Sequence, residues 1–469
     1  MADIFWQNND TLEYIFDILF TALSPFSGSE WDFTFKRPRE KQFLDLATVC
    51  RWFYNPAIKA LYRCIDFSYL DRLWSNDFAP EKVITSKLLQ LQNILPFYVN
   101  SVRIFRMPRQ NSEPFLKLLV TMENLQEISL PQSEIETIHQ VLDMCPTLES
   151  LKYWISPSAE APERRVDFKT HKLRILECRG FGVSSNFCFD PATVNLLKTL
   201  PFLDKLVLTD VVISPNNWAL DSNAIAHLKS ISIEGSKLTD MTNVLVRLFG
   251  WCNGLRTVRL MWLNCILTDV FFAIADNLHN VLHEFEVEHT GSICPKGFQY
   301  FLTKCTRLRL LHIGEGCVLD PIVFKRLSVA GFRSNSISTL YYGARDPLPS
   351  FIFNVVIKIF PQVANLSVLT DESPDNWPLT VPASIKTLPL DTLCIRPIGK
   401  TLNSYEVLFQ ETIVYSIKSV DSILDMLPRL RRMELGYRSL RVLHQLAPLY
   451  VIEWMEDSNE IEWTTTFVY

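Results

Sequence analysis

One apolar pattern recurs along most of the chain at nearly constant spacing. It consists of an apolar residue, a second three positions later and a third two positions after that, as in Leu255, Val258 and Leu260. Twelve successive copies begin 23 to 30 residues apart, with a mean near 26. Their first residues are Val99, Leu125, Leu148, Leu173, Leu203, Leu228, Leu255, Leu282, Leu308, Ile337, Val363 and Leu390, and further copies begin at Leu430 and Leu449. Such spacing predicts a repeated unit that buries its apolar side only against its neighbours.

Each copy is expected to supply one short strand. Its last two apolar residues are two positions apart, so their side chains point to the same face of a strand. Segments between the copies, such as residues 240–251 and 269–278, carry apolar residues at helical spacing. Stacked units of this kind place their strands in a parallel sheet along a curved inner wall. The sequence therefore predicts an α/β solenoid.

Three cysteines occupy a fixed place in the repeated unit. Cys145, Cys252 and Cys305 each lie three residues before the first apolar residue of a copy. Together with a Thr-Asp pair at residues 268–269 that can cap a helix, this pattern resembles the cysteine-containing leucine-rich repeats. The resemblance spans about residues 95–460 and implies a leucine-rich-repeat arc. Residues 396–429 interrupt the period, so we expect an irregular or inserted repeat there, and residues 461–469 are expected to form a C-terminal tail.

A different pattern occupies the first 90 residues. Helical spacing of apolar residues appears from Leu12 to Leu19 and from Phe43 to Phe53, and a third helix is expected over residues 57–61 after Pro56. These residues resemble an F-box. The matching positions are Asp10, Leu12, Ile15, Phe16 and Leu19, then Leu46, Val49, Cys50, Arg51 and Phe53, then Leu61, Tyr62 and Arg63. We therefore expect a small all-α F-box-like module over residues 1–70 and a connecting segment over 71–94.

The F-box resemblance implies a function in ubiquitin ligation. F-box proteins bind a Skp-type adaptor and, through it, a cullin scaffold, so the expected role is that of the substrate-recognition subunit of an SCF-type ligase. The residues that the resemblance assigns to the module and its adaptor contact are Leu12, Ile15, Phe16, Leu19, Leu46, Val49 and Phe53. The same segment also fits a plain cap over the first repeat. The alternative function is then a repeat scaffold for protein interactions with no ligase role.

The sequence contains no catalytic or cofactor motif. The chain has only 14 glycines and lacks the phosphate-binding loops and the nucleophile elbow. His279 and His283 are four residues apart but do not belong to an HExxH pattern. We therefore expect a non-catalytic subunit with no cofactor and no metal site.

Charge and apolar runs indicate an intracellular chain. The net charge of −5 gives no broad attraction for nucleic acid. The first residues lack a secretory pattern, and no apolar run reaches the roughly 18 residues of a membrane span. We expect a location in the cytoplasm, the nucleus or both, with the eleven cysteines as free and mostly buried thiols.

A protein partner is expected on the concave face of the arc, where side chains alternate with the buried apolar positions. The expected contact residues are Arg259, Met261, Glu284, Glu286, Glu288, His312 and Tyr341. Trp154 and Trp262 are further candidates, because interfaces favour aromatic anchors. Three alternating glutamates on one strand favour a basic partner, while charges compensated between neighbouring strands are the alternative. A ligand-bridged substrate would need clustered Lys and Arg residues, which the sequence does not reveal on this face.

Overall fold

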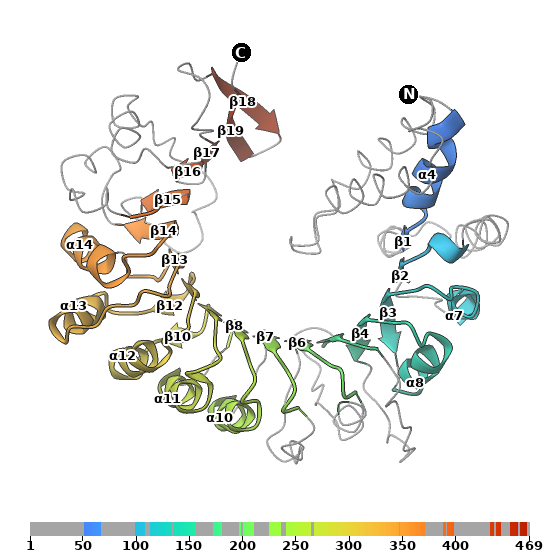
Figure 1. The fold of residues 1–469 in the computed structure, drawn as a ribbon, viewed down its shortest axis with the longest axis horizontal. Coiled ribbons are helices and arrows are strands. Elements are labelled where there is room, and N and C mark those ends of the chain that lie inside the picture. The colour runs from blue at the N-terminus through green and yellow to red at the C-terminus, as the bar shows by residue number, and fades with distance from the viewer. Residues whose placement is uncertain are drawn as a thin grey trace, which may run out of the picture. The chain divides into compact units, whose positions relative to one another are not determined.

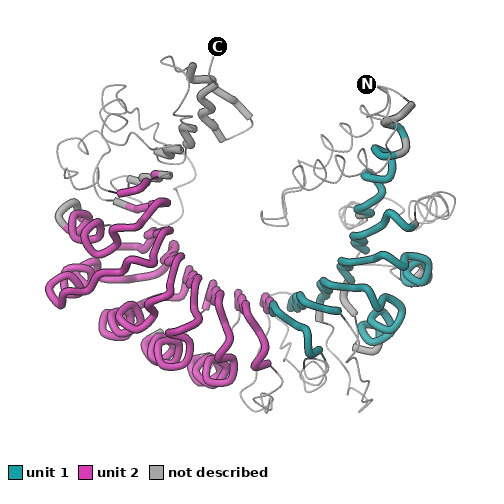
Figure 2. Tube along the Cα trace, viewed as in Figure 1, with its two compact units in different colours: residues 1–206 teal, residues 207–469 magenta. Residues whose placement is uncertain are grey.

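The computed structural model divides the chain into two compact units, residues 1–206 and residues 207–469 (Figure 2). It describes residues 51–66, 99–107, 113–133, 135–155, 172–180, 197, 200–210, 225–235, 241–263, 267–346, 348–370, 388–390, 392–397, 432–435, 438–441, 451–457 and 460–466. Strand β6 (Lys205–Thr209) contains the boundary between the two units.

Unit 1 consists of parallel strands that pair in the order of the chain. The strands are β1 (Cys64–Asp66), β2 (Ile104–Arg106), β3 (Glu127–Ser133), β4 (Ser150–Ile155) and β5 (Ile175–Arg179). The helical elements are α4 (Arg51–Leu61), the 3-10 turn η1 (Val99–Ser101), α7 (Glu113–Leu119) and α8 (Ile135–Met144). Figure 1 shows α7 and α8 on the same side of these strands.

Unit 2 repeats the same arrangement over a longer stretch. Its parallel strands are β7 (Ser230–Glu234), β8 (Thr257–Met261), β9 (Glu284–Glu288), β11 (Leu310–Ile313), β13 (Thr339–Tyr342), β14 (Asn365–Thr370), β15 (Thr392–Pro397) and β16 (Arg432–Leu435). The helices are α10 (Met241–Trp251), α11 (Leu267–Leu278), α12 (Pro295–Lys304), α13 (Ile322–Val329) and α14 (Ser350–Ile359), all on one side of the strands (Figure 1). A second, two-stranded sheet pairs β10 (Gly291–Ser292) with β12 (Cys317–Val318). Parallel strands with intervening helices confirm the solenoid-like α/β arrangement predicted from the period.

The end of the chain departs from the predicted repeat. The strands β17 (Arg438–Arg441), β18 (Val451–Asp457) and β19 (Glu460–Thr466) include two antiparallel pairs, β16 with β17 and β18 with β19. The copy predicted from Leu449 is therefore no parallel repeat, and the predicted tail over 461–469 overlaps β19. Only two residues separate β18 from β19. Such a short connection closes a hairpin, whereas a parallel pair needs a crossover of about a dozen residues or more.

A backbone ladder fixes the register of successive strands. The carbonyl of Arg256 accepts the N–H groups of His283 and Glu284 at 2.8 and 2.9 Å. In unit 1 the carbonyl of Arg103 does the same with Gln126 and Glu127, at 2.8 and 2.9 Å. Each of these carbonyls lies just before a strand. The pair of hydrogen bonds therefore aligns the start of the next strand with the start of that strand.

The apolar copies form the core, as the period predicts. In β8 the side chains of Val258 and Leu260 are fully buried, Arg259 between them is exposed, and Thr257 and Met261 on either side are half-exposed. Leu255, the first residue of the same copy, is also fully buried. Alternation of this kind places one side of each strand against the helices and leaves the other side open.

Aromatic rings fill the space between two successive repeats of unit 2. Phe271 on α11, Phe285 on β9 and Phe301 on α12 are all fully buried. The Phe285 and Phe301 rings lie 4.8 Å apart, and the Phe271 ring is 5.5 Å from Phe285 and 5.2 Å from Phe301. These tilted ring pairs add to the burial energy of each side chain. The cluster therefore ties one repeat to the next.

The helix predicted before Pro56 and the helix predicted after it are one helix in the structure. Helix α4 runs from Arg51 to Leu61 with Pro56 inside it, so the boundary predicted there is wrong. A proline in a helix removes one backbone hydrogen bond. Pro56, Ala57 and Ala60 are buried, and this packing offsets that loss.

The seven cysteines whose side chains the structure describes form no disulfide, as predicted. Cys145, Cys252 and Cys305 are buried, and burial raises their pKa values to about 11, 12 and 12. Cys252 donates to the backbone carbonyl of Ile225 at 3.3 Å, in the neighbouring repeat. Cys294, at the start of α12, is half-buried.

We expect Cys294 to be alkylated by iodoacetamide at least about ten-fold faster than Cys252 or Cys305 in the native protein. The Gly297 backbone N–H bonds to the Cys294 sulfur and lowers the pKa of this thiol, with the Thr268 side chain acting in the same direction. Mass spectrometry of the labelled peptides at mildly alkaline pH measures the three rates. Equal rates would show that the repeats open faster than the thiols react.

Candidate functional site

The strand face of unit 2 carries the residues predicted for partner binding. Arg259 and Met261 lie on β8, and the three glutamates 284, 286 and 288 lie on β9. His312 lies on β11 and Tyr341 on β13. All of these side chains are exposed or half-exposed, while the residues between them are buried. The structure therefore places the predicted set on one face across four neighbouring strands.

Part of the charge on this face is compensated between strands. The Arg259 guanidinium bonds to both oxygens of Glu286, from Nε to Oε2 at 2.8 Å and from Nη2 to Oε1 at 2.9 Å. The Thr257 hydroxyl donates to Glu284 at 3.1 Å. The negative charge of Glu286 is thus compensated by Arg259 on the neighbouring strand. Such an exposed pair contributes little to stability but fixes both side chains on the strand face.

A ladder of left-handed residues follows the strands of unit 2. Asp210, Gly235, Trp262, His289 and Gly316 come at the ends of successive strands and have φ values of +48° to +70°. Consecutive members are linked through the backbone, because the Gly235 N–H bonds to Met261 and the Trp262 N–H bonds to Glu288. Glycine adopts this conformation freely, whereas in tryptophan and histidine the Cβ atom makes it energetically unfavourable. Nothing in the local sequence indicates that Trp262 and His289 share this position.

Trp262 and His289 stack on each other at the strand ends. Their ring centroids are 3.7 Å apart and their planes differ by 13°. Although one face of its ring lies on the imidazole, Trp262 remains 55% exposed. The His289 imidazole in turn lies over Gly316, where a Cβ atom would clash with it. The unit thus presents an exposed indole in a strained backbone, a combination that recurs at functional sites.

Different charged groups surround the titratable side chains at the two ends of the strands in unit 2. Burial raises the pKa of Glu288 above its ordinary value, and the carboxylates of Glu315, Glu286 and Glu234 act in the same direction, while His289 opposes them. At the amino ends, burial lowers the pKa of His283, and the neighbouring guanidinium groups of Arg309, Arg256 and Arg307 lower it further. Carboxylates therefore gather at the carboxyl ends of β7, β9 and β11, whereas arginines outnumber the one carboxylate, Glu284, around His283.

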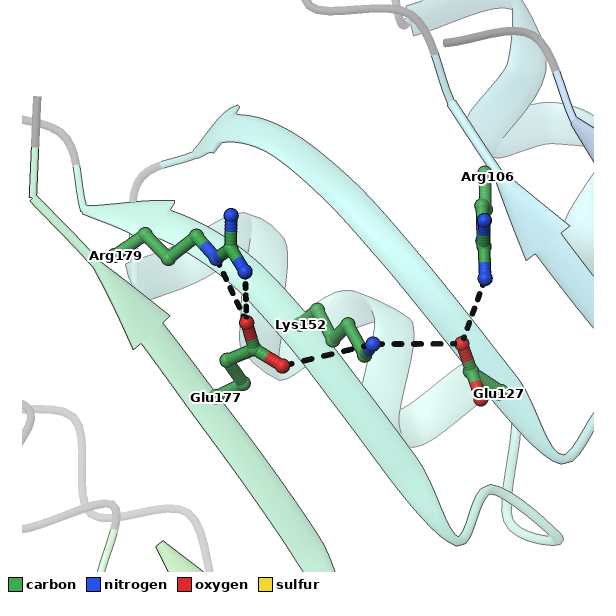
Figure 3. A network of polar contacts seen from close by, with 5 residues as sticks. All are labelled: Arg106, Glu127, Lys152, Glu177 and Arg179. Carbon is green, nitrogen blue, oxygen red and sulfur yellow. Dashed lines mark hydrogen bonds and ion pairs between the residues drawn. The ribbon is translucent and has the colours of Figure 1, made fainter. Parts of the chain in front are cut away.

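Unit 1 carries a chain of ion pairs on its own strands (Figure 3). Glu127 lies 3.8 Å from Arg106 and 3.9 Å from Lys152, and Lys152 lies 3.6 Å from Glu177. Glu177 also accepts two bonds from Arg179, at 2.6 and 2.7 Å. Strand register explains the order, since Lys152 of β4 is the direct partner of Glu177 on β5.

Basic residues are therefore clustered on a strand face, contrary to the expectation from sequence. Arg106, Lys152 and Arg179 come from three different strands and alternate with two carboxylates. Arg179 also lies over the Trp154 ring, 5.7 Å from its centroid. Aligning the copies by their apolar residues would have placed Lys152 beside Glu177. The other pairs depend on side-chain directions that the sequence does not fix.

Glu177→Gln is expected to lower the free energy of unfolding of unit 1 by about 1–3 kcal/mol, because the substitution removes a charge that bonds two cations. The Glu177 side chain is only 10% exposed, so water does not replace these contacts. Urea denaturation, monitored by hydrogen exchange of the β4 and β5 amides, measures the loss of unfolding free energy. Glu149→Gln, at an exposed position of the same unit, is the matched control. An equal effect of both substitutions would contradict a specific role for the network.

Most of the predicted adaptor-binding residues lie outside the described residues. These are Leu12, Ile15, Phe16, Leu19, Leu46 and Val49. Phe53 lies within α4, and two residues after that helix the chain enters β1, which pairs in register with β2. The sheet therefore begins inside the range assigned to the F-box-like module.

The chain matches no protein-family model and no curated protein. Within the described ranges, no group of three or more His, Cys, Asp or Glu side chains is arranged to hold a metal ion. In the same part of the chain, no helix has both the length and the apolar character needed to cross a membrane. The function is therefore argued from the residues themselves.

Proposed function

We propose that this chain is the substrate-recognition subunit of a cullin-type ubiquitin ligase. Its N-terminal F-box-like segment binds a Skp-type adaptor, and its leucine-rich repeats bind a protein substrate on their open strand face. The observation that carries the proposal is the direct continuation of the F-box-like pattern into the repeats. Helix α4 holds Arg51 and Phe53 of that pattern, and only Tyr62 and Arg63 separate it from β1.

The junction between helix and sheet is a backbone contact. The carbonyl of Arg63 accepts the N–H groups of Arg103 and Ile104, both at 2.9 Å. The ladder that joins the repeats thus begins directly after α4. An adaptor bound to the helical segment would then hold a fixed orientation to the first strands, with no long linker between them.

The proposed activity is one of proximity. A ligase subunit that holds both adaptor and substrate raises the local concentration of substrate lysines near the ubiquitin-loaded enzyme. Bond formation belongs to other subunits, so this chain needs binding surfaces alone. The open strand faces offer such surfaces, because the helices of each unit lie on the other side of its strands (Figure 1).

Ile15→Asp is expected to weaken binding of the Skp-type adaptor by at least about ten-fold, since a charge replaces an apolar side chain in the expected contact. Co-purification of the full chain with the adaptor, followed by calorimetry, measures the affinity. Val120→Asp is the matched control, because the Val120 side chain is 63% exposed and lies in the repeats. Failure of the unaltered chain to bind the adaptor would leave the repeat scaffold without a ligase role as the function.

A further inference from the structure

The carboxyl ends of the strands in unit 2 combine negative charge with an exposed aromatic ring. Glu288 and Glu315 lie on either side of His289 along this edge, and the Glu288 carboxylate is 3.6 Å from the His289 imidazole. The Trp262 ring stacks on the same imidazole, with the two ring centroids 3.7 Å apart. We call Trp262, Glu288, His289 and Glu315 the indole–carboxylate edge. The His289 imidazole thus contacts both the aromatic ring and a carboxylate of this edge.

The charge pattern restricts what this edge can bind. The pKa of Glu288 is raised partly by three further carboxylates, so negative potential accumulates there. At the opposite ends of the same strands, arginine side chains lower the pKa of His283 and repel cations. A positively charged segment is therefore attracted more strongly to the carboxyl ends than to the amino ends, where Glu284 stands among three arginines.

We propose that the indole–carboxylate edge binds an arginine side chain in a basic segment of the substrate. A guanidinium is planar, so it stacks on an indole and bonds to a carboxylate with its edge. Both groups contact His289 here, which stacks on Trp262 and lies 3.6 Å from the Glu288 carboxylate. The inference rests on the proposed function, because it takes the bound partner to be the substrate of the ligase.

The backbone conformation keeps the indole in place. Trp262 has a φ of +57°, and its N–H bonds to the carbonyl of Glu288 at 2.9 Å. His289, the left-handed residue that follows β9, stacks on one face of the ring. Because the ring is held before any partner arrives, little side-chain entropy is lost on binding.

The first test uses short fluorescein-labelled peptides and the full chain. One peptide carries arginines separated by Gly-Ser, and two matched peptides carry lysine or glutamine in their place. Fluorescence anisotropy is expected to show the arginine peptide binding several-fold more tightly than the lysine peptide and no binding of the glutamine peptide. Equal affinity for arginine and lysine would overturn the stacked guanidinium.

The second test separates the edge from general attraction by the acidic chain. Trp262→Gly keeps the left-handed backbone without strain, and Glu288→Gln keeps the size of the side chain. Each substitution is expected to lower the affinity for the arginine peptide by about ten-fold. Glu123→Gln, an exposed position in unit 1, changes the net charge equally and is expected to leave affinity unchanged. Equal losses in all three variants, or no loss in Trp262→Gly, would overturn the proposal.

Adaptor binding is measured on the same preparations. Peptide binding that depends on Trp262 in a chain that does not bind the adaptor would support the edge and refute the ligase role. Adaptor binding without any peptide binding would refute the edge alone. The two proposals therefore fail in different experiments.

Discussion

Phe301→Ala is expected to lower the free energy of unfolding of unit 2 by about 3–5 kcal/mol. The Phe301 ring contacts Phe271, Phe285 and Phe298 from three elements, with centroids 4.8 to 6.3 Å apart. Its removal leaves a cavity between two repeats that rigid neighbours fill only in part. Hydrogen exchange of α11, β9 and α12 is expected to speed up together, because the cluster belongs to all three elements.

Phe272→Ala is the matched control for this substitution. Phe272 lies on α11 beside Phe271 but is half-exposed, with its ring 5.1 Å from that of Tyr300. The same change of residue type therefore removes far less buried surface, and we expect a loss of at most about 1.5 kcal/mol. Similar losses at positions 272 and 301 would contradict the assignment of the cluster as the link between repeats.

Gly316→Ala is expected to destabilise unit 2 by about 2–3 kcal/mol and to disturb the indole–carboxylate edge at the same time. Gly316 has a φ of +70°, and a Cβ atom there would lie 2.9 Å from the Cα atom of His289 and clash with its imidazole. His289 must then move away from Trp262. Thermal denaturation measures the stability, and anisotropy with the arginine peptide measures the edge.

Two other glycines separate the causes of this effect. Gly331 has a φ of +74° but no atom near its Cβ position, so Gly331→Ala is expected to cost only the backbone strain of about 1–2 kcal/mol. Gly250 lies within α10 with open space around it, so Gly250→Ala is expected to stabilise by up to about 1 kcal/mol. Unchanged peptide binding in Gly316→Ala would show that His289 does not support the edge.

The repeated strands could be predicted from the sequence because their signal is local and recurs many times. Leu255, Val258 and Leu260 bury fully as one copy, and helices α10 and α11 lie within two residues of the predicted ranges. The face of the candidate partner residues followed from the same alternation. Apolar periodicity thus determined the core, the open face and the order of the strands.

Features that depend on backbone geometry or on side-chain direction could not be predicted. The left-handed conformation of Trp262 and His289 is unusual for these residue types and has no local signature. The ion pairs around Lys152 depend on how long side chains turn across strands. Pro56 has the local preference of a first helical turn, whereas its burial inside α4 is a tertiary effect that the local sequence does not reveal. The segment from Leu449 has the apolar pattern of a repeat, but its strand β18 pairs antiparallel with β19. The apolar pattern alone does not distinguish these two arrangements.

The doubled hydrogen bond at each strand start has a mechanical consequence. In unit 2 each of the strands β8, β9, β11 and β13 pairs with the preceding and the following strand of the large sheet. A pulling force along the chain is therefore resisted by one strand pair at a time. Stretching this unit in an optical trap should lengthen it in successive small steps, each releasing a single link, and the aromatic cluster around Phe301 should mark the step that needs the highest tension.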